Sequence, residues 1–274
     1  MTLRTIPLIL LALCPVAAQE RAFRPPAVPL IAHDPYFSVW SMADQLNAEN
    51  TKHWTGVEQP LTSLVRVDGQ TLRLMGRDPR ALAALPQKSV EVLPTRTIYE
   101  FEGSGIAVNL TFLTPALPHD PDVLSRPLSY LIWTVRATDG ATHDVQLYFD
   151  ASATLAVNTG DQAVVWSRFR LSGMDAMRLG SLQQPVLEKD GDNLRIDWGY
   201  LYLSAPPEMH AEQTAASLAA MRTSFTGGGK LPSADDTETG RAATGAGLGI
   251  VFPIGTVGAQ PIARRLMLAY DDMW

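Results

Sequence analysis

The stretch "LVRVDGQTLRLMG", residues 64–76, decides the fold class of this sequence. Apolar and polar residues alternate on both sides of Asp68-Gly69, and this period of two is typical of a β-strand with one buried face. An Asp-Gly dipeptide supplies the positive φ angles that a tight hairpin turn requires. We therefore predict two antiparallel strands joined at this dipeptide.

The same pattern recurs along the chain. Residues 98–102 and 106–113 flank Gly103-Ser104-Gly105, and residues 145–149 alternate in the same way. Residues 130–135, "YLIWTV", are apolar on both faces, which predicts a central strand covered on both sides. Many short strands separated by turns predict an all-β, mainly antiparallel fold, a large β-sandwich or supersandwich.

Two segments favour helices. Residues 78–86, "DPRALAALP", begin with an acidic cap and a proline and end at a second proline, which predicts a short helix. Residues 207–225 are rich in alanine and precede Gly227-Gly228-Gly229, which predicts a longer helix with a glycine stop. We expect one or two short helices beside the strands.

The first 18 residues have the pattern of a secretory signal peptide. Arg4 precedes an apolar run from Ile6 to Leu13, and small residues come before Gln19. The run is far shorter than the about 20 residues that span a bilayer, so we expect no membrane attachment after cleavage. We expect a secreted or periplasmic protein. Cleavage would remove Cys14, the only cysteine, and with it any disulfide or thiolate site.

The composition narrows the classes of partner. With 46% hydrophobic and 18% charged residues, the 274-residue chain has a globular composition. Its 22 basic and 28 acidic side chains give a net charge of −6 without a basic cluster, so we expect no nucleic-acid partner. Serine-hydrolase, zinc-protease and phosphate-loop motifs are absent from the sequence, and we expect no cofactor and no metal.

The segment from Ile31 to Leu61 carries most of the groups that recognise ligands. Aromatic rings stack on the C–H faces of sugars, and carboxylates accept hydrogen bonds from hydroxyl groups. One interpretation is a site for a small-molecule amide or a glycan; the other is ordinary packing of strands and corners. The candidate ligand-binding residues are Asp34, Tyr36, Trp40, His53 and Trp54.

The sequence stops at "RRLMLAYDDMW", residues 264–274, where a strand pattern runs into two adjacent carboxylates. Neighbouring strand residues point to opposite faces, so at most one of Asp271 and Asp272 faces a given cleft. We interpret these two aspartates as a domain junction. We expect the chain to be a fragment whose last residues begin a further domain.

Six stretches carry a resemblance to a known family. In order along the chain they are "RPPAVPLIAHDPYFSVWS", "HWTGVEQPLTSLVRVDGQTLRLMG", "DVLSRPLSYLIWTV", "DQAVVWSRFRLSGMDAMRLGS", "QPVLEKDGDNLRIDWGYLYLSAP" and "RRLMLAYDD". Together they resemble the amino-terminal half of the glutaminase A-type secreted proteins, over nearly the whole mature chain. The resemblance implies a β-sandwich that precedes a helical toroid domain, as in several glycosidase-like enzymes, with most of the catalytic apparatus in the helical domain.

On this basis we expect four regions. They are a signal peptide (1–18), an amino-terminal segment with the aromatic-rich loop and the first hairpin (19–76), a β-sandwich domain (77–270), and the truncated start of a missing helical domain (271–274). The missing carboxy-terminal helical domain is the expected partner. No catalytic residue is assigned to any position.

Three functional hypotheses follow. The resemblance favours the non-catalytic sandwich portion of a secreted glutaminase A-like hydrolase, which would be inactive by itself. The aromatic residues fit a free-standing carbohydrate-binding module. The third hypothesis is a structural or docking domain.

Overall fold

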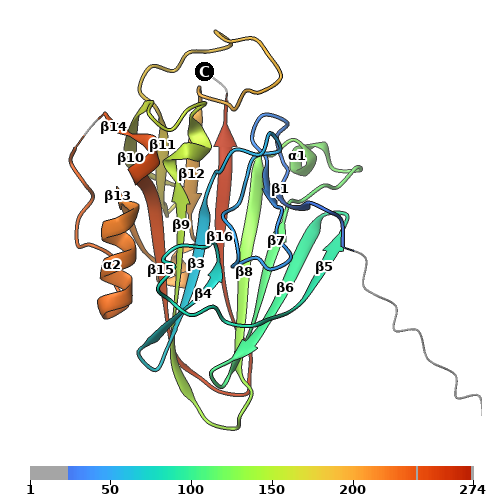
Figure 1. The fold of residues 1–274 in the computed structure, drawn as a ribbon, viewed down its shortest axis with the longest axis vertical. Helices are drawn as coiled ribbons and strands as arrows, with labels where there is room; N and C mark the ends of the chain where they lie inside the picture. The colour runs from blue at the N-terminus through green and yellow to red at the C-terminus, as the bar shows by residue number, and fades with distance from the viewer. Residues whose placement is uncertain (1–23, 239, 273–274) are drawn as a thin grey trace, which may run out of the picture.

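The computed structural model describes residues 24–238 and 240–272. Two large antiparallel sheets face each other and enclose one core, with a small two-stranded sheet beside them (Figure 1). The prediction of a mainly antiparallel all-β fold is confirmed. The predicted signal peptide, residues 1–18, lies outside the described residues, as do residues 273–274 of the predicted start of a further domain.

The larger sheet has nine strands. In chain order they are β5 (Gln87–Leu93), β6 (Arg96–Gly103), β7 (Ile106–Leu113), β8 (Leu128–Ala137), β10 (Ala163–Leu171), β11 (Met174–Ser181), β12 (Tyr200–Ser204), β14 (Arg241–Ala242) and β16 (Ile262–Asp271). Their order in the sheet is β14-β10-β11-β12-β16-β8-β7-β6-β5. The carboxyl end of the described chain therefore lies in the middle of this sheet, on β16.

The second sheet has five strands. They are β3 (Leu61–Val67), β4 (Gln70–Met75), β9 (His143–Ser152), β13 (Glu212–Ser217) and β15 (Ala246–Val257), in the order β13-β15-β9-β3-β4. The two-stranded sheet pairs β1 (Val28–Ile31) with β2 (Val39–Ser41).

Aromatic side chains fill the space between the two large sheets. Trp133 of β8 points across the core, and its ring centroid lies 5.9 Å from that of Phe149 on β9 and 5.9 Å from that of Phe252 on β15. All three side chains are fully buried. Removal of this apolar surface from water is the main force that holds the sheets together.

Within the described part of the chain, two α-helices lie outside the core, α1 (Pro121–Leu124) and α2 (Leu218–Gly228). Three short 3₁₀ turns are η1 (Ala153–Ala156), η2 (Pro207–Met209) and η3 (Ala243–Gly245). The Ser217 hydroxyl caps the start of α2, and Gly229, with φ of 70°, ends it. Phe225 of α2 packs on Tyr148, with ring centroids 5.0 Å apart, so α2 covers the outer face of the five-stranded sheet.

Both predicted hairpins are confirmed. Strands β3 and β4 meet at Asp68-Gly69, with φ angles of 49° and 89°. Strands β6 and β7 meet at Ser104-Gly105, with φ angles of 50° and 76°. Both residues of each turn take the positive φ of a type I′ hairpin, as the sequence indicated.

The predicted short helix at residues 78–86 is wrong. Strand β4 binds this segment instead: the Arg73 amide donates to the Ala83 carbonyl, and the Leu85 amide donates to the Arg73 carbonyl, both at 2.9 Å. The predicted helix at residues 207–225 is wrong in its first half, where Glu212–Ser217 forms β13 on the edge of β15. In both segments a neighbouring strand offers hydrogen bonds that outweigh the helical propensity of alanine.

Strand β8 lies inside the larger sheet, as predicted, but it is not covered on both faces. Leu131, Trp133 and Val135 are buried, whereas Tyr130, Ile132 and Thr134 are half-buried on the outer face. The apolar outer residues therefore do not mark a second core.

The first hairpin belongs to the sandwich, because β3 pairs with β9 along its length. The boundary that we place after residue 76 stays a prediction. Among the described residues, no helix is both long enough and apolar enough to cross a bilayer.

Candidate functional site

Three segments far apart in the sequence meet at the end of the sandwich where β16 ends. They are residues 33–37, residues 53–54 and the long loop 182–199 between β11 and β12. Figure 1 shows this loop above the strands, around the carboxyl end of the described chain. The meeting of these segments forms the candidate site.

A cavity of about 410 Å³ opens between them. We call it the aromatic cavity, because Tyr36, Trp54 and Trp198 contribute to its wall. Its polar lining comes from the loop: Lys189, Asp190, Asp192, Arg195 and Asp197. Cavities of this volume are typical of sites for small molecules.

The aromatic rings are presented to solvent to different degrees. Tyr36 and Trp54 are each 53% exposed, which is unusual for side chains of this size. Trp198 is partly buried against the core, and its ring centroid lies 5.9 Å from that of Tyr36. The Tyr270 hydroxyl on β16 donates to the Trp198 carbonyl at 2.7 Å, which holds the inner wall of the cavity in place.

Asp34 places Tyr36 at the cavity. Its Oδ1 accepts the amide hydrogens of Tyr36 at 2.7 Å and Phe37 at 3.0 Å, the pattern of an Asx turn. Phe37 then stacks on Tyr270, with centroids 4.7 Å apart, which anchors the turn to β16. Burial raises the pKa of Asp34; the two amide hydrogen bonds oppose this shift, and Asp272 adds to it.

His53 lies beneath the cavity and is 1% exposed. Burial and, to a smaller extent, the nearby Arg195 cation lower its pKa to about 4. Its Nδ1 accepts the Thr55 amide hydrogen at 3.3 Å, so the neutral ring carries its proton on Nε2. The ring centroid lies 5.4 Å from that of Trp54. His53 therefore supports the tryptophan as a neutral side chain.

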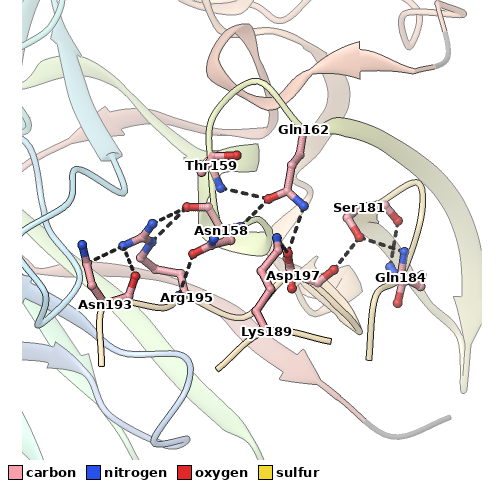
Figure 2. A network of polar contacts seen from close by, with 9 residues as sticks. All are labelled: Asn158, Thr159, Gln162, Ser181, Gln184, Lys189, Asn193, Arg195 and Asp197. Carbon is pink, nitrogen blue, oxygen red and sulfur yellow. Dashed lines mark hydrogen bonds and ion pairs between the residues drawn. The ribbon is translucent and has the colours of Figure 1, made fainter. Parts of the chain in front are cut away.

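The loop 182–199 is held by a polar network (Figure 2). The buried Asp197 carboxylate accepts from Lys189 Nζ at 2.7 Å and from Gln162 Nε2 at 2.9 Å, while Ser181 donates to the Asp197 carbonyl. The Gln184 amide group binds both the amide and the carbonyl of Gly199. These contacts tie both ends of the loop to the strands.

Arg195 joins the loop to the chain after η1. Its guanidinium donates to the Asn158 carbonyl from Nε at 3.0 Å and from Nη2 at 2.6 Å, and to Asn193 Oδ1 at 2.8 Å (Figure 2). Burial lowers the pKa of Arg195, and Asp197 opposes this shift. Most of its donors bind carbonyl oxygens, so Arg195 mainly holds the loop 182–199 against the chain at Asn158.

Gly199 is required where the loop enters β12. Its φ is +78°, and a Cβ atom at this position would lie 2.3 Å from the Asp271 carbonyl oxygen. No side chain fits so close to a backbone atom. The close approach of Gly199 to β16 brings Trp198 beside the end of that strand.

A second cavity of about 560 Å³ lies on the other side of Arg195, which lines both cavities. Three of its charged side chains are in ion pairs: Arg77 Nη1 lies 3.0 Å from Glu58 Oε1, and Arg222 binds the buried Asp150 beneath it. Ion pairs already satisfy these groups. The aromatic cavity is therefore the stronger candidate for a ligand.

The structure brings four of the five predicted ligand-binding residues to this end: Asp34, Tyr36, His53 and Trp54. Trp40 lies elsewhere, half-buried on β2, where its indole donates to the Ser38 hydroxyl at 3.2 Å and its amide pairs with Lys52. Asp271 and Asp272 lie at the end of β16, and Asp271 pairs with Tyr200. Their role as a domain junction stays a prediction.

Sequence reasoning missed the inner wall of the cavity. Lys189, Asp190, Asp192 and Trp198 line the cavity but were not among the predicted ligand-binding residues. The density of charged and aromatic residues in "EKDGDNLRIDW", 188–198, was the available signal. Among the described residues, no cluster of three or more His, Cys, Asp or Glu side chains is arranged to hold a metal ion.

Residues 95–273, well over half of the chain, match the family described as "Domain of unknown function (DUF5127)". The chain belongs to this family. Residues 12–86 of this DUF5127 protein match a second family, described as "Domain of unknown function (DUF4964)".

Two curated relatives bear the name glutaminase. The DUF5127 chain is 27% identical over 221 residues to glutaminase A of Aspergillus oryzae, an alignment that covers 78% of this chain and 32% of that protein. It is 23% identical over 248 residues to a probable glutaminase of Arthroderma benhamiae, covering 81% of this chain and 28% of that protein. The resemblance to glutaminase A-type proteins is confirmed. The chain spans only about a third of the length of these relatives.

Solved structures show more distant likenesses. A putative kojibiose phosphorylase from the human microbiome aligns with a TM-score of 0.41 and 6% identity, over 84% of this chain and 24% of that chain. A GalM/aldose epimerase homologue from C. elegans aligns with a TM-score of 0.43 and 9% identity, over 90% of this chain and 99% of that chain.

Proposed function

We propose that this DUF5127 chain is the non-catalytic β-sandwich portion of a glutaminase A-like hydrolase, and that a helical domain of the longer protein carries the catalytic groups. One observation carries the proposal: at the candidate site, the histidines and the best-placed acids already have structural roles. The names of the two curated relatives support the hydrolase family, and their greater length leaves room for a catalytic domain.

The histidines at this end are poor proton-transfer groups. His53 is buried and His33 is half-buried, and the pKa of each is lowered to about 4, mainly by burial. A general base needs a pKa near the working pH and a path to the substrate. Both rings are neutral at pH 7, and each binds a neighbouring hydroxyl group, that of Ser129 or of Thr55.

Two acids of the site, Asp34 and Asp197, also have partners. Asp34 Oδ1 accepts two backbone amide hydrogens, and Asp197 is buried against Lys189 and Gln162. Hydrolysis by paired carboxylates needs one free acid and one free base at a defined separation. Neither Asp34 nor Asp197 is free in this sense.

The test is ammonia release from L-glutamine by the purified chain, with the glutaminase A of Aspergillus oryzae as the positive control. We expect no turnover above background. A cooperative urea transition would show that the inactive chain is folded. Turnover that is abolished by Asp34→Asn or His53→Gln would overturn the proposal.

We also propose that the protein is secreted or periplasmic, on the strength of residues 1–18 alone. Amino-terminal sequencing of protein recovered from the medium or the periplasm tests this. A mature chain that begins near Gln19 is the expected result, and full-length protein retained in the cytoplasm would contradict it.

A further inference from the structure

We propose that the aromatic cavity binds a saccharide, with Tyr36 and Trp54 stacking on sugar rings and the loop acids accepting hydrogen bonds from sugar hydroxyls. This binding activity goes beyond the proposed function, since it requires no hydrolysis by this chain. The cavity of about 410 Å³ is large enough for a small-molecule ligand.

The two outer rings of the cavity, Tyr36 and Trp54, are unusually exposed. Tyr36 and Trp54 each leave 53% of their surface in contact with solvent, although apolar faces of this size are normally buried. Neither ring is loosely placed, because Asp34 holds the turn of Tyr36 and His53 lies against Trp54. Sugar rings present C–H faces that cover such aromatic surfaces.

The polar lining supplies both kinds of hydrogen-bonding group. Asp190 and Asp192 are exposed acceptors without an ion pair among the residues that the structure describes. Lys189 carries three N–H donors and uses one on Asp197, at 2.7 Å. A sugar hydroxyl both donates and accepts, so adjacent hydroxyls can bind an aspartate and the lysine together.

The site is organised before a ligand arrives. Asp197 and Arg195 are buried and hold the middle of the loop, and the Tyr270 hydroxyl holds Trp198. A site that is already ordered loses less conformational entropy on binding. The order of these side chains is typical of a ligand-binding pocket and not of an unstructured surface loop.

The charges disfavour other small ligands. Three aspartates and two cations line the cavity, and both cations already have partners, so an anionic ligand meets net repulsion. Three aromatic rings also suit a quaternary ammonium ion. However, a quaternary ammonium ion has no hydroxyl groups to bind the aspartate acceptors and the Lys189 donor of this lining. A neutral, hydroxyl-rich ligand agrees best with the full set of groups.

The experiment is calorimetry and tryptophan fluorescence with the full chain and neutral oligosaccharides at millimolar concentration. The probes are cellotriose, maltotriose, laminaritriose, mannotriose and triacetylchitotriose. We expect saturable binding of at least one probe. Trp54→Ala and Tyr36→Ala should each weaken it about tenfold, which corresponds to about 1.4 kcal/mol.

Trp40→Phe is the matched control, because Trp40 lies outside the cavity. The affinity of this variant for the sugar should equal that of the unmodified protein. Tetramethylammonium, L-glutamine and glutamate are the competing ligands. No heat with any sugar from folded protein, equal binding by Trp54→Ala, or saturable binding only of a competing ligand would each overturn the proposal. None of these readouts depends on ammonia release, so failure here leaves the proposed function intact.

Discussion

His143 lies between two carboxylates at the hairpin end of the sandwich, away from the candidate site. Its Nδ1 is 2.6 Å from Asp68 Oδ2, and its Nε2 is 3.1 Å from Asp139 Oδ2. The hydrogen bond to Asp68, followed by that to Asp139, raises the pKa of His143. The His143 hydrogen bond lowers the pKa of Asp68, and the Ala141 amide, followed by His143, lowers that of Asp139.

These directions predict a pH dependence of stability. The raised pKa means that the contribution of His143 is complete below its unfolded value, about 6.5, and is lost as pH rises through the folded value. The lowered pKa values of Asp68 and Asp139 mean that their contribution is complete above about 4 and is lost at lower pH. The cluster therefore stabilises most between about pH 4 and 6.5.

We expect His143→Gln to destabilise the protein more at about pH 5.5 than at about pH 9, as measured by urea unfolding of both proteins at each pH. His119→Gln, at an exposed position outside the cluster, serves as the control. An equal loss of stability at the two pH values would contradict the prediction.

At the scale of elements, helix α2 is fastened to the five-stranded sheet by a buried ion pair. Arg222 Nε lies 2.7 Å from Asp150 Oδ2, and Arg222 Nη2 lies 2.8 Å from the Thr62 hydroxyl. Asp150 is 0% exposed and also accepts from the Tyr148 hydroxyl at 2.7 Å. These partners therefore supply the hydrogen bonds that water would otherwise give this carboxylate.

Removal of the arginine leaves a buried, uncompensated carboxylate. We expect Arg222→Met to lower the free energy of unfolding by about 3–5 kcal/mol in urea titrations. The control is Arg265→Met, which breaks the exposed pair between Arg265 and Glu208 and should cost less than about 1 kcal/mol. Equal effects of the two substitutions would show that the burial of Asp150 is not decisive.

Elements differ in how well local sequence predicts them. The hairpin at Asp68-Gly69 depends on φ angles that neighbouring residues set, so its pattern was sufficient. Residues 78–86 instead hydrogen-bond to Arg73 on the edge strand β4. Glu212–Ser217 pairs with β15, which is distant in sequence. Helical propensity is a property of the local sequence and does not reflect pairing with those strands, so it predicted helices in both segments.

At the scale of the whole molecule, Trp133 connects the two large sheets. Its indole donates from β8 to the Ser63 hydroxyl on β3 at 3.0 Å, and its ring lies between Phe149 and Phe252. One side chain thus joins strands β3, β8, β9 and β15. The two sheets should consequently unfold together.

We expect Trp133→Ala to cost about 3–5 kcal/mol, through lost apolar burial and a residual cavity. Far-UV circular dichroism and tryptophan fluorescence should follow one shared urea transition, shifted to lower urea. Trp54→Ala, at an exposed ring, should change stability by less than about 0.5 kcal/mol. Two separate transitions would contradict a single core.

The candidate site was only partly predictable at this scale. Asp34, Tyr36, His53 and Trp54 lie close in sequence, and their residue types indicated a ligand. Trp40 has the same residue type in the same segment, but β2 holds it outside the aromatic cavity. The contact between Trp198 and Tyr36 could not be predicted from the sequence, because it depends on β12 and β16 being neighbours in the sheet.

The sequence by itself determined the all-β class and the hairpins, since period-two alternation and positive-φ turns act over a few residues. Tertiary structure decided which aromatic residues share a cavity, which strands frame it, and which segments became strands instead of helices. Those outcomes depend on hydrogen bonds and packing between residues far apart in the chain, and only the folded arrangement of the sheets brings them together.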